Sequence, residues 1–285
     1  MPPHLMSRLS VLDHSRDVTG MTYVYPVVSR RAGGVSVGIN LNPNNACNWR
    51  CIYCQVPDLQ RGGPPPIDLA RLEEELFDML SQLYRGDYLA QHAPPEARRV
   101  VDIAFSGNGE PTSAAEFPAA VDMVRRMLDS FAMPAPLRIR LITNGSLLDR
   151  EDVQAGIAQI GLQGGEVWFK VDGVDPARMR LINGVGYAPT TVLRRLKCCG
   201  ELCETWVQTC RFVLDGQPIM AAESDAYLDF LTAAKDFVAG VHLYGLARPS
   251  MQAEALRLSA LPAEQLERLA AHIRQKTGLT VQVSP

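Results

Sequence analysis

Six apolar runs rich in β-branched residues recur along the chain, and each predicts a buried strand. We expect these strands at residues 35–41, 100–105, 137–142, 167–171, 206–213 and 240–243. Segments with helical spacing separate them, at 69–84, 117–131, 151–160, 176–182, 190–199 and 224–237, and a helix at 262–277 precedes a short strand at 280–283. Strand–helix alternation of this kind predicts an α/β fold, with a parallel sheet covered by outer helices.

The alternation alone leaves two architectures open, a closed or partial barrel and an open doubly wound sheet. Both place functional loops at the carboxyl ends of the strands. The one Pro/Gly cluster, at 62–66, is too short to link two domains. We therefore expect an extension at 1–34 that packs on the core, a core at 35–250, and a C-terminal helix and strand extension at 251–285.

Composition and charge narrow the class of protein. The chain has 285 residues and a formal net charge of −3, whereas domains that coat nucleic acid are usually basic. It has no apolar stretch of about 18 residues, and its first 20 residues are polar, so we expect neither a membrane span nor a signal peptide. A cytoplasmic location follows as an expectation. There, the seven cysteines would serve as ligands or core thiols rather than as disulfides.

Three of these cysteines follow the first predicted strand in the spacing C-x3-C-x2-C, as Cys47, Cys51 and Cys54. Asparagine and arginine residues between them indicate a polar loop rather than a core segment. Three thiolates on a short loop can hold three corners of a 4Fe–4S cubane and leave the fourth iron open. A structural zinc site would need a fourth Cys or His nearby, and the closest histidines are His14 and His92.

Polar motifs also follow the later strands. Gly107 and Gly109 bracket Asn108 just before Glu110, which predicts a sharp turn with either a solvated acid or a ligand-binding carboxylate. Asn144 lies in a Thr-Asn-Gly turn after the next strand. At the end of the fourth strand, Lys170 and Asp172 point to one face of the sheet. They either neutralise each other as a buried pair or contact a ligand.

Taken together, the cysteine spacing, with Tyr53 before the last cysteine, resembles the signature of the radical S-adenosylmethionine (radical SAM) superfamily. The resemblance implies a partial (β/α)6 barrel, one 4Fe–4S cluster on the three cysteines, and S-adenosylmethionine chelated by the open iron. Reductive cleavage would then give a 5′-deoxyadenosyl radical that removes hydrogen from a substrate. It further implies a reductant such as flavodoxin or ferredoxin. The implied cofactor-binding residues are Tyr53, Gly107, Gly109, Glu110, Asn144, Lys170 and Asp172.

The ordered motifs Ser29-Arg30-Arg31, Ser106 to Thr112, Thr143 to Ser146, Ile182-Asn183-Gly184 and Ala247-Arg248-Pro249 resemble the branch related to the wyosine-base synthases that act on tRNA. Those synthases hold a second cluster on cysteines before the main motif, and residues 1–46 here contain none. Charge also argues against folded RNA, because only Arg30, Arg31 and Arg248 are expected near the site to neutralise phosphates. We expect a small-molecule or nucleoside substrate. A tRNA-modifying enzyme and an iron–sulfur electron carrier without radical chemistry are the alternatives.

Several residues keep more than one interpretation. Cys198, Cys199, Cys203 and Cys210 could hold an auxiliary cluster or pack as small apolar residues, and Gly200 is expected to end their helix. Arg211 and Arg248 could bind an anionic substrate group or form surface ion pairs. His242 alternates with apolar neighbours, which favours a core histidine over a ligand or general base.

Overall fold

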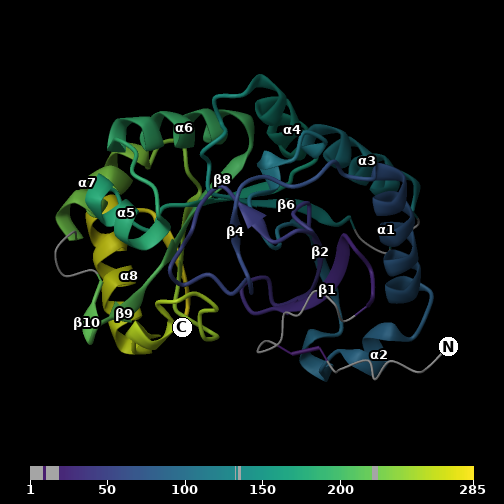
Figure 1. Ribbon diagram of the computed structural model, residues 1–285, viewed down its shortest axis with the longest axis horizontal. Helices are drawn as coiled ribbons and strands as arrows, with labels where there is room; N and C mark the ends of the chain where they lie inside the picture. The colour runs from purple at the N-terminus through teal and green to yellow at the C-terminus, as the bar shows by residue number, and fades with distance from the viewer. Residues whose placement is uncertain (1–8, 11–18, 132, 134–135, 220–223) are drawn as a thin grey trace.

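The computed structural model describes residues 9–10, 19–131, 133, 136–219 and 224–285. Its centre is an eight-stranded sheet in the order β1-β2-β5-β6-β7-β8-β11-β13 (Figure 1). In this sheet β2, β5, β6, β7, β8, β11 and β13 run parallel to one another, and β1 pairs antiparallel with β2 at the edge. The strand bounds are β1 Val24–Ser29, β2 Gly34–Ile39, β5 Val100–Phe105, β6 Arg138–Thr143, β7 Glu166–Lys170, β8 Glu204–Cys210, β11 Gly240–Tyr244 and β13 Thr280–Ser284.

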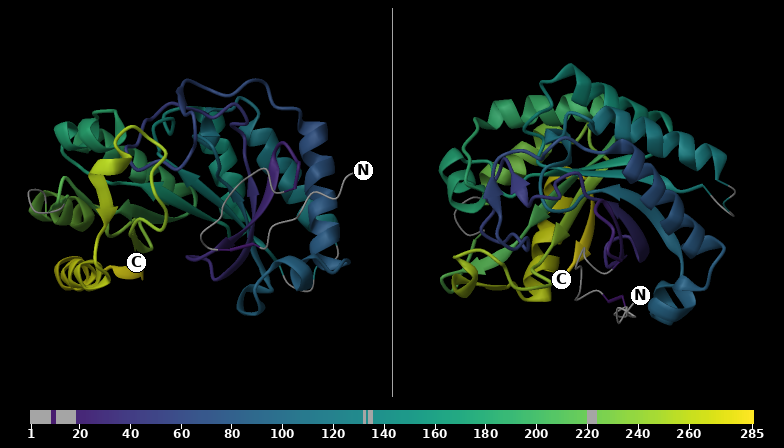
Figure 2. Two further views of the ribbon diagram at one scale, coloured as in Figure 1. Left: turned by 60° about the horizontal axis from the view of Figure 1, so that its bottom comes forward. Right: turned by 45° about the vertical axis from the view of Figure 1, so that its right-hand side comes forward.

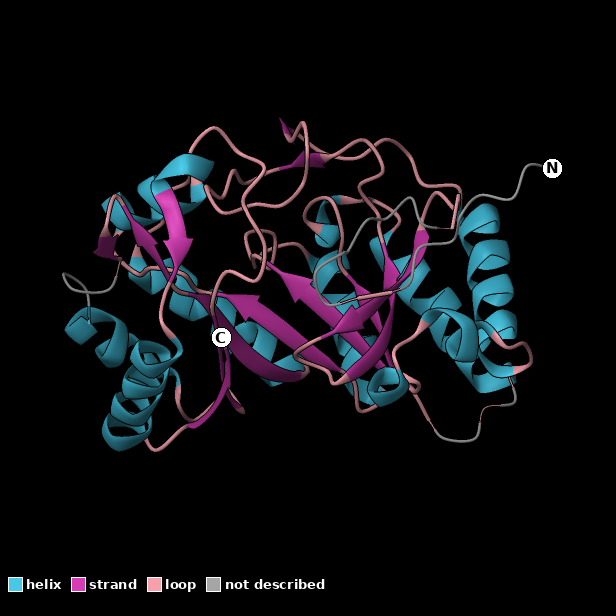
Figure 3. Cartoon of the chain, turned by 90° about the horizontal axis from the view of Figure 1, so that it is seen from below, coloured by secondary structure: helices cyan, strands magenta, loops and turns pink. Residues whose placement is uncertain are grey.

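Helices cover the outer face of this curved sheet (Figures 1 and 2). Neighbouring helices pack against each other in the order α1, α3, α4, α6, α7, α8, so the sheet and its outer helices form a partial barrel, as predicted. In Figure 3 the strands form the middle layer, with helices around them. The helix bounds are α1 Leu69–Tyr84, α2 Tyr88–His92, α3 Phe117–Ser130, α4 Glu151–Leu162, α5 Pro176–Asn183, α6 Pro189–Leu202, α7 Ser224–Ala234 and α8 Ala263–Thr277.

Helix α1 illustrates how the sequence specifies these elements. The Asp68 side chain accepts a hydrogen bond from the Arg71 backbone N–H at 3.1 Å and caps the helix. Leu72, Leu76 and Met79 recur at helical spacing and are fully buried against the sheet. Burial of each such side chain contributes roughly 1.5–3 kcal/mol, so the apolar stripe rather than the cap fixes the helix on the barrel.

Two predicted boundaries are wrong. The strand predicted at 206–213 is two strands, because the chain leaves the large sheet at Arg211. Strand β9 (Phe212–Leu214) instead pairs with β10 (Gln217–Pro218) and β12 (Leu258–Ala260) in a small second sheet. Gly200 does not end its helix, since α6 continues to Leu202. A Cβ at Gly200 would lie 2.0 Å from the Phe237 carbonyl oxygen, so this glycine allows close packing within a continuous helix.

The segments outside the predicted core also contribute to the main sheet. Strand β1 lies within 1–34 and pairs along its whole length with β2, while β13 lies within 251–285 and pairs with β11. Residues 1–8 and 11–18 of the predicted extension lie outside the described residues. The division into three segments stays a prediction. No helix in the described part of the chain combines the length and apolarity needed to cross a bilayer.

Candidate functional site

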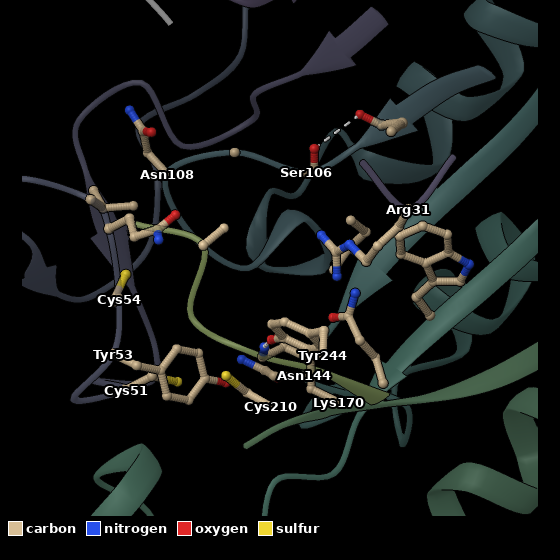
Figure 4. Close-up of a pocket in the computed structure, with 18 of the residues that line it drawn as sticks. Arg31, Cys51, Tyr53, Cys54, Ser106, Asn108, Asn144, Lys170, Cys210 and Tyr244 are labelled. Carbon is tan, nitrogen blue, oxygen red and sulfur yellow. Dashed lines mark hydrogen bonds between the residues drawn. The ribbon is translucent and has the colours of Figure 1, made fainter. Parts of the chain in front are cut away.

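A cavity of about 300 Å³ opens where the parallel strands end (Figure 4). Each of five strands supplies a lining residue from its carboxyl end or the position just after it. These residues are Ser106, Asn144, Lys170, Cys210 and Tyr244. The loop with the C-x3-C-x2-C spacing closes one side of the cavity. Strand direction in a parallel sheet therefore brings motifs far apart in sequence to a single site.

The three cysteines of this loop all line the cavity with free, partly exposed thiols. Backbone hydrogen bonds hold the loop on the end of α5, from the Arg50 N–H to the Asn183 carbonyl at 3.0 Å and from the Ile52 N–H to the Ile182 carbonyl at 2.8 Å. The short strand β3 (Ala46–Cys47) pairs with β4 (Gln60–Arg61), and this pairing fixes the start of the cysteine loop. The Ile182-Asn183-Gly184 motif thus supports the cysteine loop.

Two of these thiols lie in surroundings that disfavour the bare thiolate. Burial raises the pKa of Cys47 to about 11 and that of Cys51 to about 12. N–H groups nevertheless point at both sulfurs: the Trp49 backbone N–H is 3.4 Å from Cys47 Sγ, and Asn183 Nδ2 is 3.2 Å from Cys51 Sγ. Bound iron would displace the thiol protons and supply the missing positive charge.

The cysteine geometry can be compared with what a metal site requires. Among the described residues, no three His, Cys, Asp or Glu side chains converge as a single metal ion would require. A cubane has a different requirement, because each thiolate binds a different iron atom. Three free thiols on one cavity wall, two of them receiving N–H donors, fit a 4Fe–4S cluster.

The glycine turn after β5 brings this strand end against the cysteine loop. Gly107 has a φ of +140°, a conformation that other residues rarely adopt. A Cβ at Gly109 would lie 2.2 Å from the carbonyl oxygen of Ala46, the residue before the first cysteine. Both glycines line the cavity. They allow the close approach of β5 to the loop, which a side chain would prevent.

Glu110 is buried at this junction and lines the cavity, so it is not the solvated acid of the alternative interpretation. Its Oε1 accepts from the hydroxyls of Thr112 and Thr143, both at 2.6 Å, and from the Thr112 N–H at 3.2 Å. Its Oε2 accepts from the Asn144 N–H at 2.6 Å. Burial raises the pKa of Glu110 despite these donors. Because a carboxylate oxygen can accept about two hydrogen bonds, Oε2, which accepts one from the described residues, keeps capacity for another donor.

Asn144 ties the third strand end to the same loop. Its Nδ2 donates to Asn48 Oδ1 at 2.8 Å, and Asn48 Nδ2 donates in turn to the Ser146 hydroxyl at 2.8 Å. Asn48 lies between the first two cysteines. Asn144 therefore lines the cavity, as the sequence suggests, and also positions the cysteine loop.

Lys170 and Asp172 do not form the direct pair that was one of the two interpretations. Lys170 lines the cavity and donates to the Tyr244 hydroxyl at 3.0 Å. Asp172 is buried behind Tyr53, whose hydroxyl donates to Asp172 Oδ2, while the Cys210 N–H donates to Oδ1 at 2.9 Å. Although burial lowers it, Tyr244 and Asp172 together raise the pKa of Lys170 above its ordinary value. Lys170 is thus a cation at the cavity wall, and Asp172 fixes Tyr53.

Other predicted candidates lie elsewhere. Arg211 is buried and donates to the Asp172 carbonyl at 2.6 Å, so the surface ion pair predicted as one of its two interpretations is wrong. Arg248 lines the cavity and donates to Gln55 Oε1 at 2.9 Å. Cys199 and Cys203 pack in the core at the end of α6, while Cys210 is buried on the cavity wall. His242 stacks on Trp206, with ring centres 4.7 Å apart, as a core histidine.

Sequence reasoning missed several residues that line the cavity, namely Ser36, Arg140, Trp168, Gln208 and Tyr244. Arg31, which the sequence offered in its Ser29-Arg30-Arg31 motif, lines the cavity as well. Arg140 and Gln208 are polar positions inside otherwise apolar strands, and period-2 alternation could have placed both on the inner face. Arg31 lies between β1 and β2, where no such pattern exists.

Comparison with protein families gives one match to this chain. The model of the Radical SAM superfamily matches residues 41–224, which include the cysteine loop and the strand ends from β5 to β8. UPF0026 protein MJ1312 of Methanocaldococcus jannaschii is 35% identical over 164 residues, which is 55% of this chain and 42% of that protein. GTPase Obg of Brachyspira hyodysenteriae is 25% identical over 132 residues, 46% of this chain and 17% of that protein. The chain thus spans less than half the length of these curated relatives.

Solved structures share the fold at low sequence identity. TYW1 with a lysine–pyruvate adduct bound has a TM-score of 0.56 and 16% identity, over 86% of this chain and 74% of that chain. Streptococcus suis SuiB bound to precursor peptide SuiA has a TM-score of 0.56 and 11% identity, over 87% and 48%. HydG, a maturase of the [FeFe]-hydrogenase, has a TM-score of 0.55 and 10% identity, over 86% and 50%.

Proposed function

Because the chain belongs to the radical SAM superfamily, we propose that it cleaves S-adenosylmethionine reductively and removes hydrogen from a substrate held in the same cavity. One observation carries this proposal: the three free thiols, the glycine turn and Glu110 all line a single cavity. An iron–sulfur electron carrier needs a cluster near the surface but no pocket for an amino-acid cofactor. The pocket therefore favours radical chemistry over electron transfer.

In the proposed site, Cys47, Cys51 and Cys54 would hold one 4Fe–4S cluster as thiolates. When bound, the cluster would supply the electron that breaks the sulfonium bond of S-adenosylmethionine, giving methionine and a 5′-deoxyadenosyl radical. The N–H groups at the sulfurs of Cys47 and Cys51 would stabilise the negative charge of the thiolates. An external reductant of the flavodoxin or ferredoxin class would deliver the electron.

Glu110 and Tyr53 are the residues that we propose to hold S-adenosylmethionine. Glu110 Oε2 accepts one hydrogen bond from the described residues, the Asn144 N–H, and would accept a second from the methionyl ammonium group. The Tyr53 ring is fixed through its hydroxyl by Asp172 and would pack beside the adenine. Lys170 lies 5.0 Å from the centre of the Tyr53 ring, where it can donate to a ribose hydroxyl. Asp172 acts in this proposal through Tyr53.

We propose a small molecule or a nucleoside as substrate. Arg30, Arg31 and Arg248 line the cavity. If each contacted one phosphate, the three contacts would give only weak RNA affinity at physiological salt. A tRNA-modifying activity is the second candidate. The observation in its favour is the structural likeness to TYW1, which extends over 86% of this chain.

The experiment is a search for 5′-deoxyadenosine after anaerobic reconstitution and reduction with dithionite. We expect the wild-type protein to form it from S-adenosylmethionine. The triple variant Cys47→Ala, Cys51→Ala, Cys54→Ala should form none, because no ligand for the cluster remains. Cys198→Ala removes a thiol outside the cavity and should keep the wild-type rate within about twofold, as surface changes usually do. A cluster-loaded, reduced wild type that leaves S-adenosylmethionine intact would point to the electron carrier instead.

A further inference from the structure

Two buried nitrogen atoms of residues that line the cavity lie unpartnered. Arg31 Nη1 and Gln208 Nε2 are both buried and have no hydrogen-bond acceptor in the described part of the protein. Both residues line the cavity. In Figure 4 the guanidinium of Arg31 points into the cavity, at the opposite side from Cys54. Buried donors are nearly always paired in native proteins, so two orphans on one wall indicate an acceptor that binds there.

Charge balance gives the sign of that acceptor. Arg140, the neighbouring arginine, bonds to the carboxylates of Glu166 and Asp102. Lys170 has the Tyr244 hydroxyl as partner and Asp172 nearby. Arg31 has no carboxylate partner in the described ranges, and its contacts are with aromatic rings. Arg31 is therefore a positive charge that no carboxylate of the described residues balances.

Ring contacts determine which part of Arg31 can meet a ligand. Its guanidinium carbon lies 4.9 Å from the ring centres of both Trp168 and Tyr244. Such cation–π contacts engage the flat face of the guanidinium, whereas its N–H groups lie in the plane. The available edge matches the two oxygens of a carboxylate. A neutral amide donor from Gln208 adds a third hydrogen bond without a second charge.

We propose that Arg31 and Gln208 bind a carboxylate group of the substrate. A carboxylate carries one negative charge, which one unpaired arginine balances, whereas a phosphate monoester carries close to two at neutral pH. A carboxylate bound here directs the rest of a small substrate toward the cysteine end of the cavity. This inference rests on the proposed function and adds the class of substrate to it.

The test uses acetate as probe, with the reconstituted protein and S-adenosylmethionine under anaerobic conditions. Line broadening of ¹³C-acetate in NMR should saturate with wild-type protein. Arg31→Met should weaken acetate binding at least tenfold. Arg31→Lys should weaken acetate binding less, because lysine keeps the positive charge but loses the paired N–H groups of the guanidinium. Arg125→Met, which removes an arginine paired with Asp122 on the outer helix α3, should bind like wild type. Thermal unfolding of each variant shows whether it folds. If Arg31→Met does not fold, the acetate affinity of Arg31→Lys is compared with that of wild type instead.

A parallel titration with inorganic phosphate, followed by ³¹P NMR, tests the class of anion. Binding of phosphate in place of acetate overturns the carboxylate assignment. Acetate binding that is absent, or equal in wild type and Arg31→Met, overturns the site. The same samples are assayed for 5′-deoxyadenosine. Wild type that forms it while failing the acetate test contradicts only this inference, whereas wild type that forms none contradicts the proposed function.

Discussion

His242 shows how the cavity residues control a neighbouring ionisation. Its ring packs between Trp168 and Trp206, with ring centres at 4.5 and 4.7 Å. Burial, together with the positive charges of Arg31 and Arg140, lowers the pKa of His242 from 6.5 to about 3. The residue is therefore neutral in the folded protein throughout the neutral and mildly acid range.

This pKa predicts acid sensitivity. Below pH 6.5 the unfolded chain takes up a proton on His242, while the folded protein does not until about pH 3. The unfolded state then binds more protons, so stability falls as the pH drops through this window. We expect His242 to cost roughly 2 kcal/mol of unfolding free energy between pH 6.5 and 5. His242→Phe keeps a ring between the two tryptophans. Its unfolding free energy, measured by urea denaturation at pH 6.5 and pH 5, should therefore fall by roughly 2 kcal/mol less than that of wild type. Equal losses in both proteins would show that His242 does not drive the effect.

Single residues also show where sequence reasoning succeeds. The three cysteines and Glu110, which sequence reasoning expected at one site, line one cavity, and they could be grouped because their spacing and their place after strands are local features. Asp172 was placed at the correct strand end, but the direct pair with Lys170, one of its two interpretations, is wrong. Its partners, Tyr53 and the Cys210 N–H, come from distant parts of the chain. Arg31 was expected near the site as a possible phosphate contact, but its aromatic surroundings could not be predicted, because Trp168 and Tyr244 come from two distant strands.

At the scale of elements, helix α6 shows a glycine that local rules misjudge. A glycine near a predicted helix end favours a C-cap. Here the reason is tertiary, because the α6 backbone at Gly200 packs onto the Phe237 carbonyl. The break between β8 and β9 has a similar cause. The Arg211 N–H bonds to the Tyr244 carbonyl at 2.9 Å, after which the chain turns into the small sheet.

We expect Gly200→Ala to destabilise the protein by about 1–3 kcal/mol, the usual cost of overpacking. Alanine has the higher helix propensity, worth about 1 kcal/mol, so propensity alone predicts the opposite sign. The measurement is the unfolding free energy from urea denaturation. Gly63→Ala is the matched control, because a Cβ at Gly63 meets no atom within 4 Å and should change stability by less than about 0.5 kcal/mol. A Gly200→Ala variant as stable as wild type would contradict the packing account.

At the scale of the whole molecule, the partial barrel was predictable because strand–helix alternation repeats along the chain. The six predicted strands correspond to β2, β5, β6, β7, β8 and β11, and they lie side by side in the sheet in their sequence order. The antiparallel edge strand β1 was missed, since the segment around Tyr25 and Pro26 lacks a clear alternating pattern. The cavity follows from this topology, because each strand adds its carboxyl end to the same rim.

Above all, we propose that S-adenosylmethionine binds the open iron of a cluster carried by Cys47, Cys51 and Cys54. Electron paramagnetic resonance of the reduced, reconstituted protein tests this claim most directly, because a new ligand on one iron changes the spectrum of the whole cluster. We predict a reduced-cluster signal that shifts when S-adenosylmethionine is added, and that is absent in the triple cysteine variant. A fully loaded cluster whose spectrum is identical with and without S-adenosylmethionine would contradict the account.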